Sequence, residues 1–171
     1  RAQAVWQPPG SGAPSRPRGL RRRRLHPARR GPRNGHVHGD GPFTKSASAK
    51  MVELTGSPTV LLTTSGTAAL EMAVRLLGIG EGDEVIVPSF TFSSGAASIV
   101  AAGGVPVFVD IEGDSGNVDP AEIEKAITAK TKAISVMHYG GAPVDMDAIM
   151  AISRKHGIPI IEDNAHGLAV K

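Results

Sequence analysis

The chain has 171 residues, a length typical of one domain, and hydrophobic residues make up 40% of it, which is enough for a buried core. It contains no cysteine, so disulfides and thiolate metal sites are excluded. The formal net charge of +3 is the sum of a basic N-terminal segment and an acidic remainder. Residues 1–34 contain ten Arg and no acid, whereas residues 35–171 contain nine Lys or Arg against sixteen acids, a net charge of −7.

The apolar runs of the chain are short and interrupted, so no membrane-spanning segment is predicted. The charged N-terminus is not followed by the apolar core of a signal peptide, and we therefore expect a cytoplasmic protein. His36, His38 and Asp40 superficially resemble metal ligands, but no partner cluster accompanies them. No metal site is predicted.

Residues 1–34 form a segment rich in Arg, Pro, Gly and Ser, with the run RRRR at 21–24. Its few apolar residues cannot offset the entropy of the chain, so the segment is predicted to be disordered. One hypothesis is a nucleic-acid-binding or nuclear-targeting arm, since clustered Arg attracts phosphates. The favoured hypothesis is a non-native extension, such as a gene-boundary error in GC-rich DNA.

From Thr59 onward, short apolar runs alternate with helical patterns. The predicted strands are 59–62, 84–87, 105–110, 132–137 and 159–162, and Pro106 suggests an entry or edge position for the third. The predicted helices are 67–77, 93–102, 120–129 and 146–156, with Asp119 and Asp145 as caps of the last two. Strands separated by helices predict an α/β fold with three α/β/α layers and a mainly parallel sheet.

The turn Thr-Thr-Ser-Gly-Thr-Ala-Ala at 63–69 lies between a predicted strand and a predicted helix. Free N–H groups at a helix N-terminus favour an anion. Gly66 allows an anion to approach the backbone, and the hydroxyls of Ser65 and Thr67 can add hydrogen bonds. The turn matches neither the Walker A pattern nor Gly-x-Gly-x-x-Gly. Taken alone, it is explained by an ordinary helix cap.

Three ring side chains follow the ends of predicted strands. Phe90 and Phe92 follow the second strand, where an aromatic ring can stack on a planar ligand. A core position is the alternative for both, and it is the favoured one for Phe90. His138 follows the fourth strand, where it can titrate or bond a ligand, or be held as a hydrogen-bonded loop residue.

Asp163 ends the last apolar strand, in the segment Ile-Ile-Glu-Asp-Asn-Ala-His-Gly at 160–167. Ligands of open α/β sheets bind outside the carboxyl ends of the strands. A carboxylate beside a heteroaromatic nitrogen keeps that nitrogen protonated. An anion-binding turn, a stacking ring and an acid together suit pyridoxal phosphate, whose protein partners are a lysine and an acid at the pyridinium nitrogen.

Six stretches, in order, match one known family: GDGPFT at 39–44, SGTAAL at 65–70, GDEVIVPSFTF at 82–92, VFVD at 107–110, HYGG at 138–141 with DMD at 145–147, and IEDNAHG at 161–167. From about residue 35 onward the chain resembles the DegT/StrS family of sugar-nucleotide aminotransferases. These are pyridoxal-phosphate enzymes with the aspartate-aminotransferase-like fold. The resemblance implies that residues 59–171 are the first half of the cofactor-binding large domain and that residues 35–58 are its N-terminal segment.

The resemblance implies a role for each matching site residue. Asp163 would pair with the pyridinium nitrogen, and His166 would lie beside the 3′ oxygen; these are the two catalytic candidates. Phe92 would stack on the ring. The phosphate would be bound at the turn by Ser65, Gly66 and Thr67. Asn164 stands where a small residue is commoner in the family.

The implied reaction is transfer of an amino group, with glutamate as the expected donor, to a 4-keto-6-deoxy sugar nucleotide, for surface polysaccharide or amino-sugar biosynthesis. The resemblance also implies a homodimer in the full-length protein. The family's Schiff-base lysine lies downstream on a Ser-x-His-x-x-Lys-like segment, which these 171 residues do not contain. Lys171 follows Asp163 too soon to replace it, so this chain by itself is expected to be a fragment without turnover.

Three alternatives remain. A sugar dehydratase of the same family would use the same fold with His in place of the lysine. A Rossmann nucleotide-binding module is disfavoured because the glycine fingerprint is absent. A nucleic-acid-binding protein rests on residues 1–34 alone, and the acidic domain behind them argues against it.

Overall fold

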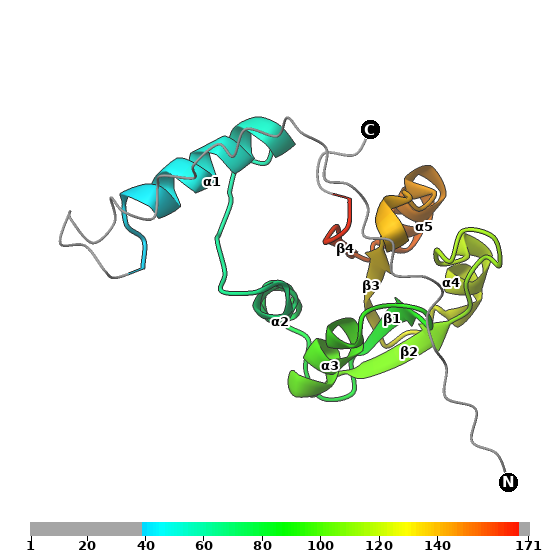
Figure 1. Ribbon diagram of the computed structural model, residues 1–171. Coiled ribbons are helices and arrows are strands. Elements are labelled where there is room, and N and C mark those ends of the chain that lie inside the picture. The colour runs from blue at the N-terminus through cyan, green and yellow to red at the C-terminus, as the bar shows by residue number, and fades with distance from the viewer. Residues whose placement is uncertain (1–38, 168–171) are drawn as a thin grey trace, which may run out of the picture. The chain divides into compact units, whose positions relative to one another are not determined.

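The computed structural model describes residues 39–167 (Figure 1). The chain divides into two units, Arg1–Phe43 and Thr44–Lys171. Of the first unit, the structure describes only the bend at Gly39 and Asp40 and the residues up to Phe43. The predictions for residues 1–34 lie outside the described residues, and the boundaries at 34/35 and 58/59 stay predictions.

Four strands form one parallel sheet in the second unit. They are β1 (Glu84–Pro88), β2 (Val105–Val109), β3 (Thr131–Met137) and β4 (Ile160–Asp163), in the spatial order β2-β1-β3-β4. All three pairings are parallel. The two inner strands are buried almost throughout, as a sheet covered on both faces requires.

Helices cover both faces of this sheet, which confirms the predicted three-layer α/β/α fold (Figure 1). One face packs on α2 (Gly66–Leu76) and α3 (Ser93–Ala101), through a core cluster that includes Val74 and Ile99. The other face packs on α4 (Pro120–Ala126) and α5 (Met146–His156), through a cluster that includes Ile123 and Ile149. Burial of these aliphatic side chains is the main stabilisation of the unit.

The helix ends follow the local sequence signals. Asp119 Oδ1 accepts the N–H of Ala121 at 2.8 Å, with Pro120 in the first turn of α4. Asp145 Oδ1 accepts the N–H of Ala148 at 3.0 Å at the start of α5. Gly157 ends α5 with a left-handed φ of 68°, a conformation that favours glycine.

Two predicted elements differ from the structure. Residues 59–62 do not form a strand, because no neighbouring strand among residues 39–167 pairs with them, and Leu61 is 61% exposed. The helix predicted to reach residue 129 ends at Ala126, since Ile127 is extended and the backbone of Thr128 bonds with Thr131 instead.

Two further features complete the described chain. Residues 42–55 form the helix α1 (Pro42–Thr55), which contains no buried residue and which the hydrophobic pattern did not predict. Pro106 lies in β2, an edge strand of the described sheet, as its proline suggested. Within residues 39–167, the helices are too short or too polar to cross a membrane.

Candidate active site

The site lies where the sheet reverses its winding. The chain leaves β1 through α3 toward β2 on one face, and leaves β3 through α5 toward β4 on the other face. The loops after β1 and β3 therefore diverge, and they leave a crevice at the carboxyl edge between these strands. Ligands of open α/β sheets bind at such a switch point.

A pocket of about 280 Å³ opens at this edge. It lies close to the lower end of the volumes that small-molecule sites occupy, roughly 300–1,000 Å³. Its lining comes from the start of α2, the segment after β1, the end of β3 and the end of β4. The lining residues are Gly66, Thr67, Leu70, Phe92, Ser94, Met137, Asp163, Ala165 and His166. Five of the six site residues predicted from sequence thus line one pocket, although they span a hundred residues of chain.

Ser65 is the exception and does not line this pocket. Its Oγ accepts the N–H of Ala68 at 3.1 Å and caps α2, the role of an ordinary helix cap. The N–H groups of Gly66 and Thr67 have no hydrogen-bond partner among the described residues, so they are left for an anion. A Cβ at Gly66 would meet no atom within 4 Å, which shows how open this turn is.

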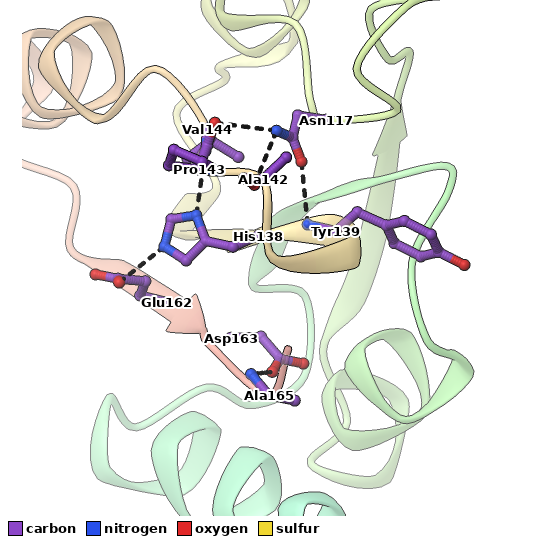
Figure 2. A network of polar contacts seen from close by, with 9 residues as sticks. All are labelled: Asn117, His138, Tyr139, Ala142, Pro143, Val144, Glu162, Asp163 and Ala165. Carbon is purple, nitrogen blue, oxygen red and sulfur yellow. Dashed lines mark hydrogen bonds and ion pairs between the residues drawn. The ribbon is translucent and has the colours of Figure 1, made fainter. Parts of the chain in front are cut away.

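Asp163 is the last residue of β4 and pairs in register with Met137 at the end of β3. Its Oδ1 accepts the N–H of Ala165 at 3.1 Å, the contact drawn at the end of β4 in Figure 2. No described residue donates to its other oxygen. The loop therefore orients the carboxylate and leaves one oxygen available to a ligand.

Phe90 and Phe92, the two aromatic residues that follow β1, lie in different surroundings. Phe92 is 62% exposed and lines the pocket, so the core alternative is wrong for it. Phe90 is 46% exposed, so a core position is wrong for it too. Instead its ring contacts Tyr139 with centroids 4.2 Å apart, and Tyr139 meets the ring of His166 edge-on at 5.7 Å.

His166 lines the pocket and its ring is oriented from outside it. The main-chain N–H of Gly140 donates to Nδ1 of His166 at 3.2 Å. A ring nitrogen that accepts a hydrogen bond carries no proton, so the neutral ring has its proton on Nε2. His166 therefore offers a donor at Nε2, which suits a ligand oxygen.

His138 has a structural position rather than a ligand-binding one. It is buried, its Nδ1 accepts the N–H of Val144 at 3.1 Å, and its Nε2 lies 2.9 Å from Glu162 Oε1. Figure 2 shows the ring held between these two partners, which assigns the proton to Nε2. Of the two predictions for His138, the hydrogen-bonded loop residue is the one that the structure supports.

Asn117 holds the same loop from the opposite side. Its Nδ2 donates to the carbonyls of Ala142 and Pro143, each at 3.1 Å, and its Oδ1 accepts the N–H of Tyr139 at 3.1 Å (Figure 2). The Asn117 side chain is nearly fully buried, and its three bonds are partly shielded from water. The loop at 138–144 that presents Gly140 to His166 is therefore fixed at both ends.

Four residues that line the pocket were not predicted as site residues, because none stands in a sequence pattern that marks a binding residue: Leu70, Ser94, Met137 and Ala165. The local signal is position alone: Met137 is the last residue of β3, and Ser94 lies in the first turn of α3, the helix that follows β1.

The residues that superficially resemble metal ligands form no site in the described part of the chain. Asp40 lies at a left-handed φ of 57° in the first unit, and His36 and His38 lie outside the described residues. Within residues 39–167, no three His, Asp or Glu side chains are grouped as metal ligands.

Comparison with protein families identifies the chain. The model of the DegT/DnrJ/EryC1/StrS aminotransferase family matches residues 21–171. The chain belongs to this family. The match begins within the segment at 1–34, fourteen residues before residue 35, from which the sequence motifs of the family are expected.

Solved structures of other proteins share the fold of this chain. The chain is similar to DesV from S. venezuelae, with 39% identity and a TM-score of 0.73, covering 75% of this chain and 34% of that one. It is similar to an aminotransferase from Psychrobacter cryohalolentis, with 37% identity and a TM-score of 0.79, covering 82% and 36%. It is also similar to NtdA from Bacillus subtilis, which was solved with bound pyridoxamine phosphate; the identity is 36%, the TM-score 0.73, and the coverage 75% and 29%. The matched region is thus about a third of the length of these relatives.

Proposed function

We propose that this chain forms part of the cofactor site of a sugar-nucleotide aminotransferase that uses pyridoxal phosphate. One observation carries the proposal: a single pocket joins the open N-terminus of α2, the exposed ring of Phe92 and the free carboxylate oxygen of Asp163. These are donors for a phosphate, a surface for a planar ring and an acceptor for a protonated ring nitrogen. Family membership and the NtdA structure support this choice of ligand.

Each residue has one task in this proposal. The N–H groups of Gly66 and Thr67 bind the phosphate, because they are unpartnered and lie at the positive end of the α2 dipole. Phe92 covers one face of the ring. Asp163 stabilises the protonated form of the ring nitrogen through its free oxygen. The Nε2–H of His166 donates to the ring oxygen.

When bound, the cofactor supplies an electron sink for moving an amino group between two carbonyl carbons. Asp163 keeps the ring nitrogen positive, which is what makes the ring withdraw electrons. We propose glutamate as the amino donor and a 4-keto-6-deoxy sugar nucleotide as the acceptor, with a homodimer as the assembly of the whole protein. The chain's 34% identity to Spr1654 from Streptococcus pneumoniae, a candidate sugar aminotransferase, supports a sugar as the acceptor.

Binding of pyridoxamine phosphate tests the cofactor site, because this form needs no covalent bond to a lysine. Titration calorimetry on the 171-residue chain should detect binding. Asp163→Asn should weaken it roughly ten- to a hundred-fold, since a charge-assisted hydrogen bond is worth about 1.5–3 kcal/mol. Phe92→Ala should weaken it several-fold through the lost ring contact.

Phe108→Ala is the matched control, because Phe108 is also exposed, at 57%, but lies on the edge strand β2 and does not line the pocket. Its affinity for pyridoxamine phosphate should equal that of the parent chain. Unchanged affinity in both the Asp163 and Phe92 variants would contradict the proposal.

A further inference from the structure

Two buried serines, Ser94 and Ser98, lie one turn apart in α3, and only the hydroxyl of Ser98 is hydrogen-bonded within the protein. Ser98 is 4% exposed, and its Oγ donates to the carbonyl of Gly95 at 2.8 Å. Ser94 is 8% exposed, and its hydroxyl has no hydrogen-bond partner among residues 39–167. The Ser94 Oγ is not among the fully enclosed atoms that lack a partner, so it is reached from the pocket that Ser94 lines and is available to an acceptor on a ligand there.

The position of Ser94 indicates what kind of acceptor this is. Ser94 lines the pocket together with Phe92 and Asp163. It also lies in the first turn of α3, whose N-cap residue Phe92 provides no side-chain hydrogen bond. The N–H of Gly95 bonds to the carbonyl of Phe92, whereas the N–H groups of Ser93 and Ser94 have no partner among the described residues. This corner of the pocket therefore contains several unused donors at the positive end of a helix, which favours an anionic oxygen.

Asp163 is the one carboxylate among the residues that line this pocket, and it has a free oxygen. No hydrogen bond joins it to Ser94 in the structure. The hydroxyl and the carboxylate are thus available to different atoms of one ligand. A ligand with both an anionic oxygen and a protonated ring nitrogen would satisfy them together.

We propose that the hydroxyl of Ser94 donates a hydrogen bond to an anionic oxygen of pyridoxamine phosphate, either on its phosphate or on its ring. This inference rests on the proposed function, and it adds to that site a second helix N-terminus, that of α3, beside that of α2. Gly66 and Thr67 then bind from one helix and Ser94 from the other.

The experiment compares Ser94→Ala with Ser98→Ala in the 171-residue chain, with pyridoxamine phosphate as the probe. Ser94→Ala should weaken binding about five- to ten-fold, the effect of one hydrogen bond. It should leave the melting temperature of the unliganded chain equal or higher, because it removes an unpartnered hydroxyl. Ser98→Ala should do the reverse: an unchanged affinity and a lower melting temperature, because its hydroxyl is already bonded within the helix.

Pyridoxamine without the phosphate separates the two possible acceptors. If Ser94 bonds the phosphate, Ser94→Ala weakens only the phosphorylated ligand; if it bonds the ring oxygen, it weakens both ligands by the same factor. Either result supports the proposal. Equal affinity of Ser94→Ala and the parent chain for pyridoxamine phosphate would overturn it while leaving the proposed cofactor site intact. A parent chain that binds no pyridoxamine phosphate would instead remove the proposed function itself.

Discussion

The main-chain N–H of Gly140 lies 3.2 Å from Nδ1 of His166, on the side of the ring that faces the 138–144 loop. Because Nδ1 accepts this hydrogen bond, the proton of the neutral ring is on Nε2. A backbone amide therefore determines that His166 can donate a hydrogen bond into the pocket that it lines. The loop itself is held by His138 and Asn117. His138 and Asn117, which do not line the pocket, thus help to fix the position of the proton on His166, which does.

We predict that neutral His166 exists as the Nε2–H form. Ring-selective ¹⁵N NMR on the 171-residue chain should show a protonated Nε2 and an unprotonated Nδ1 for His166. His138 should show the same pattern, because its Nδ1 also accepts a main-chain N–H, from Val144. A His166 ring protonated on Nδ1 at neutral charge would contradict the contact with Gly140.

Gly141→Ala should disturb this arrangement. Gly141 has a φ of 86°, and a Cβ there would lie 3.1 Å from the carbonyl oxygen of His166. Strain in the left-handed region and the close contact together predict a loss of about 1–3 kcal/mol in the free energy of unfolding, measured by urea denaturation. Gly113→Ala is the control, since Gly113 has no positive φ and open space around it. A variant at Gly141 as stable as the one at Gly113 would refute this reading of the loop.

His138→Ala should be strongly destabilising. It leaves the N–H of Val144 buried without a partner and removes a side chain that is only 8% exposed. We expect a loss of about 2–4 kcal/mol in unfolding free energy, measured by urea denaturation. His156→Ala is the matched control: its ring also meets a glutamate, Glu124, at 2.9 Å, but it lies nearer the surface, and the loss should stay below about 1 kcal/mol. Similar losses in both variants would argue against a structural role for His138.

Asn164→Ala should stabilise the chain. The Oδ1 of Asn164 is buried without a hydrogen-bond partner in the described part of the chain, and it would lie only 2.5 Å from a Cβ added at Gly167. Removal of an unsatisfied buried acceptor predicts a gain of about 1 kcal/mol, seen as a higher melting temperature. Gly167→Ala should lower the melting temperature, because the added Cβ would clash with Asn164 Oδ1. Combining it with Asn164→Ala, which removes that oxygen, should restore the stability of the parent chain. A less stable Asn164→Ala variant would show that the amide has a partner.

The Glu124 carboxylate should make stability depend on pH in acid. Hydrogen bonds from Lys155 and His156 lower the pKa of Glu124 below its usual value of 4.5. A depressed folded-state pKa contributes stability above the unfolded-state pKa, and this contribution is lost as the pH falls through the folded-state value. Glu124→Gln should therefore lower the melting temperature near neutral pH and match the parent chain well below pH 4.5. A difference that persists in strong acid would assign the effect to packing instead.

Local chemistry in the sequence was enough to predict most of the fold. The caps Asp119 and Asp145 and the stop at Gly157 act within one turn of helix, so their effect can be read from neighbouring residues. The strand at 84–88 is apolar on both faces and is found at the centre of the sheet. The strand predicted at 59–62 failed for the opposite reason, because a strand needs a partner that local sequence does not specify.

The sequence by itself determined which residues would gather at one pocket, since Gly66, Phe92 and Asp163 stand at the strand and helix ends that a parallel sheet brings to one edge. Only the tertiary structure decided how those groups are used. The free hydroxyl of Ser94, the proton position on His166 and the burial of His138 depend on contacts between segments distant in sequence. Hydrogen bonds of this kind are set by the packing of whole loops, and no short pattern of residues carries that information.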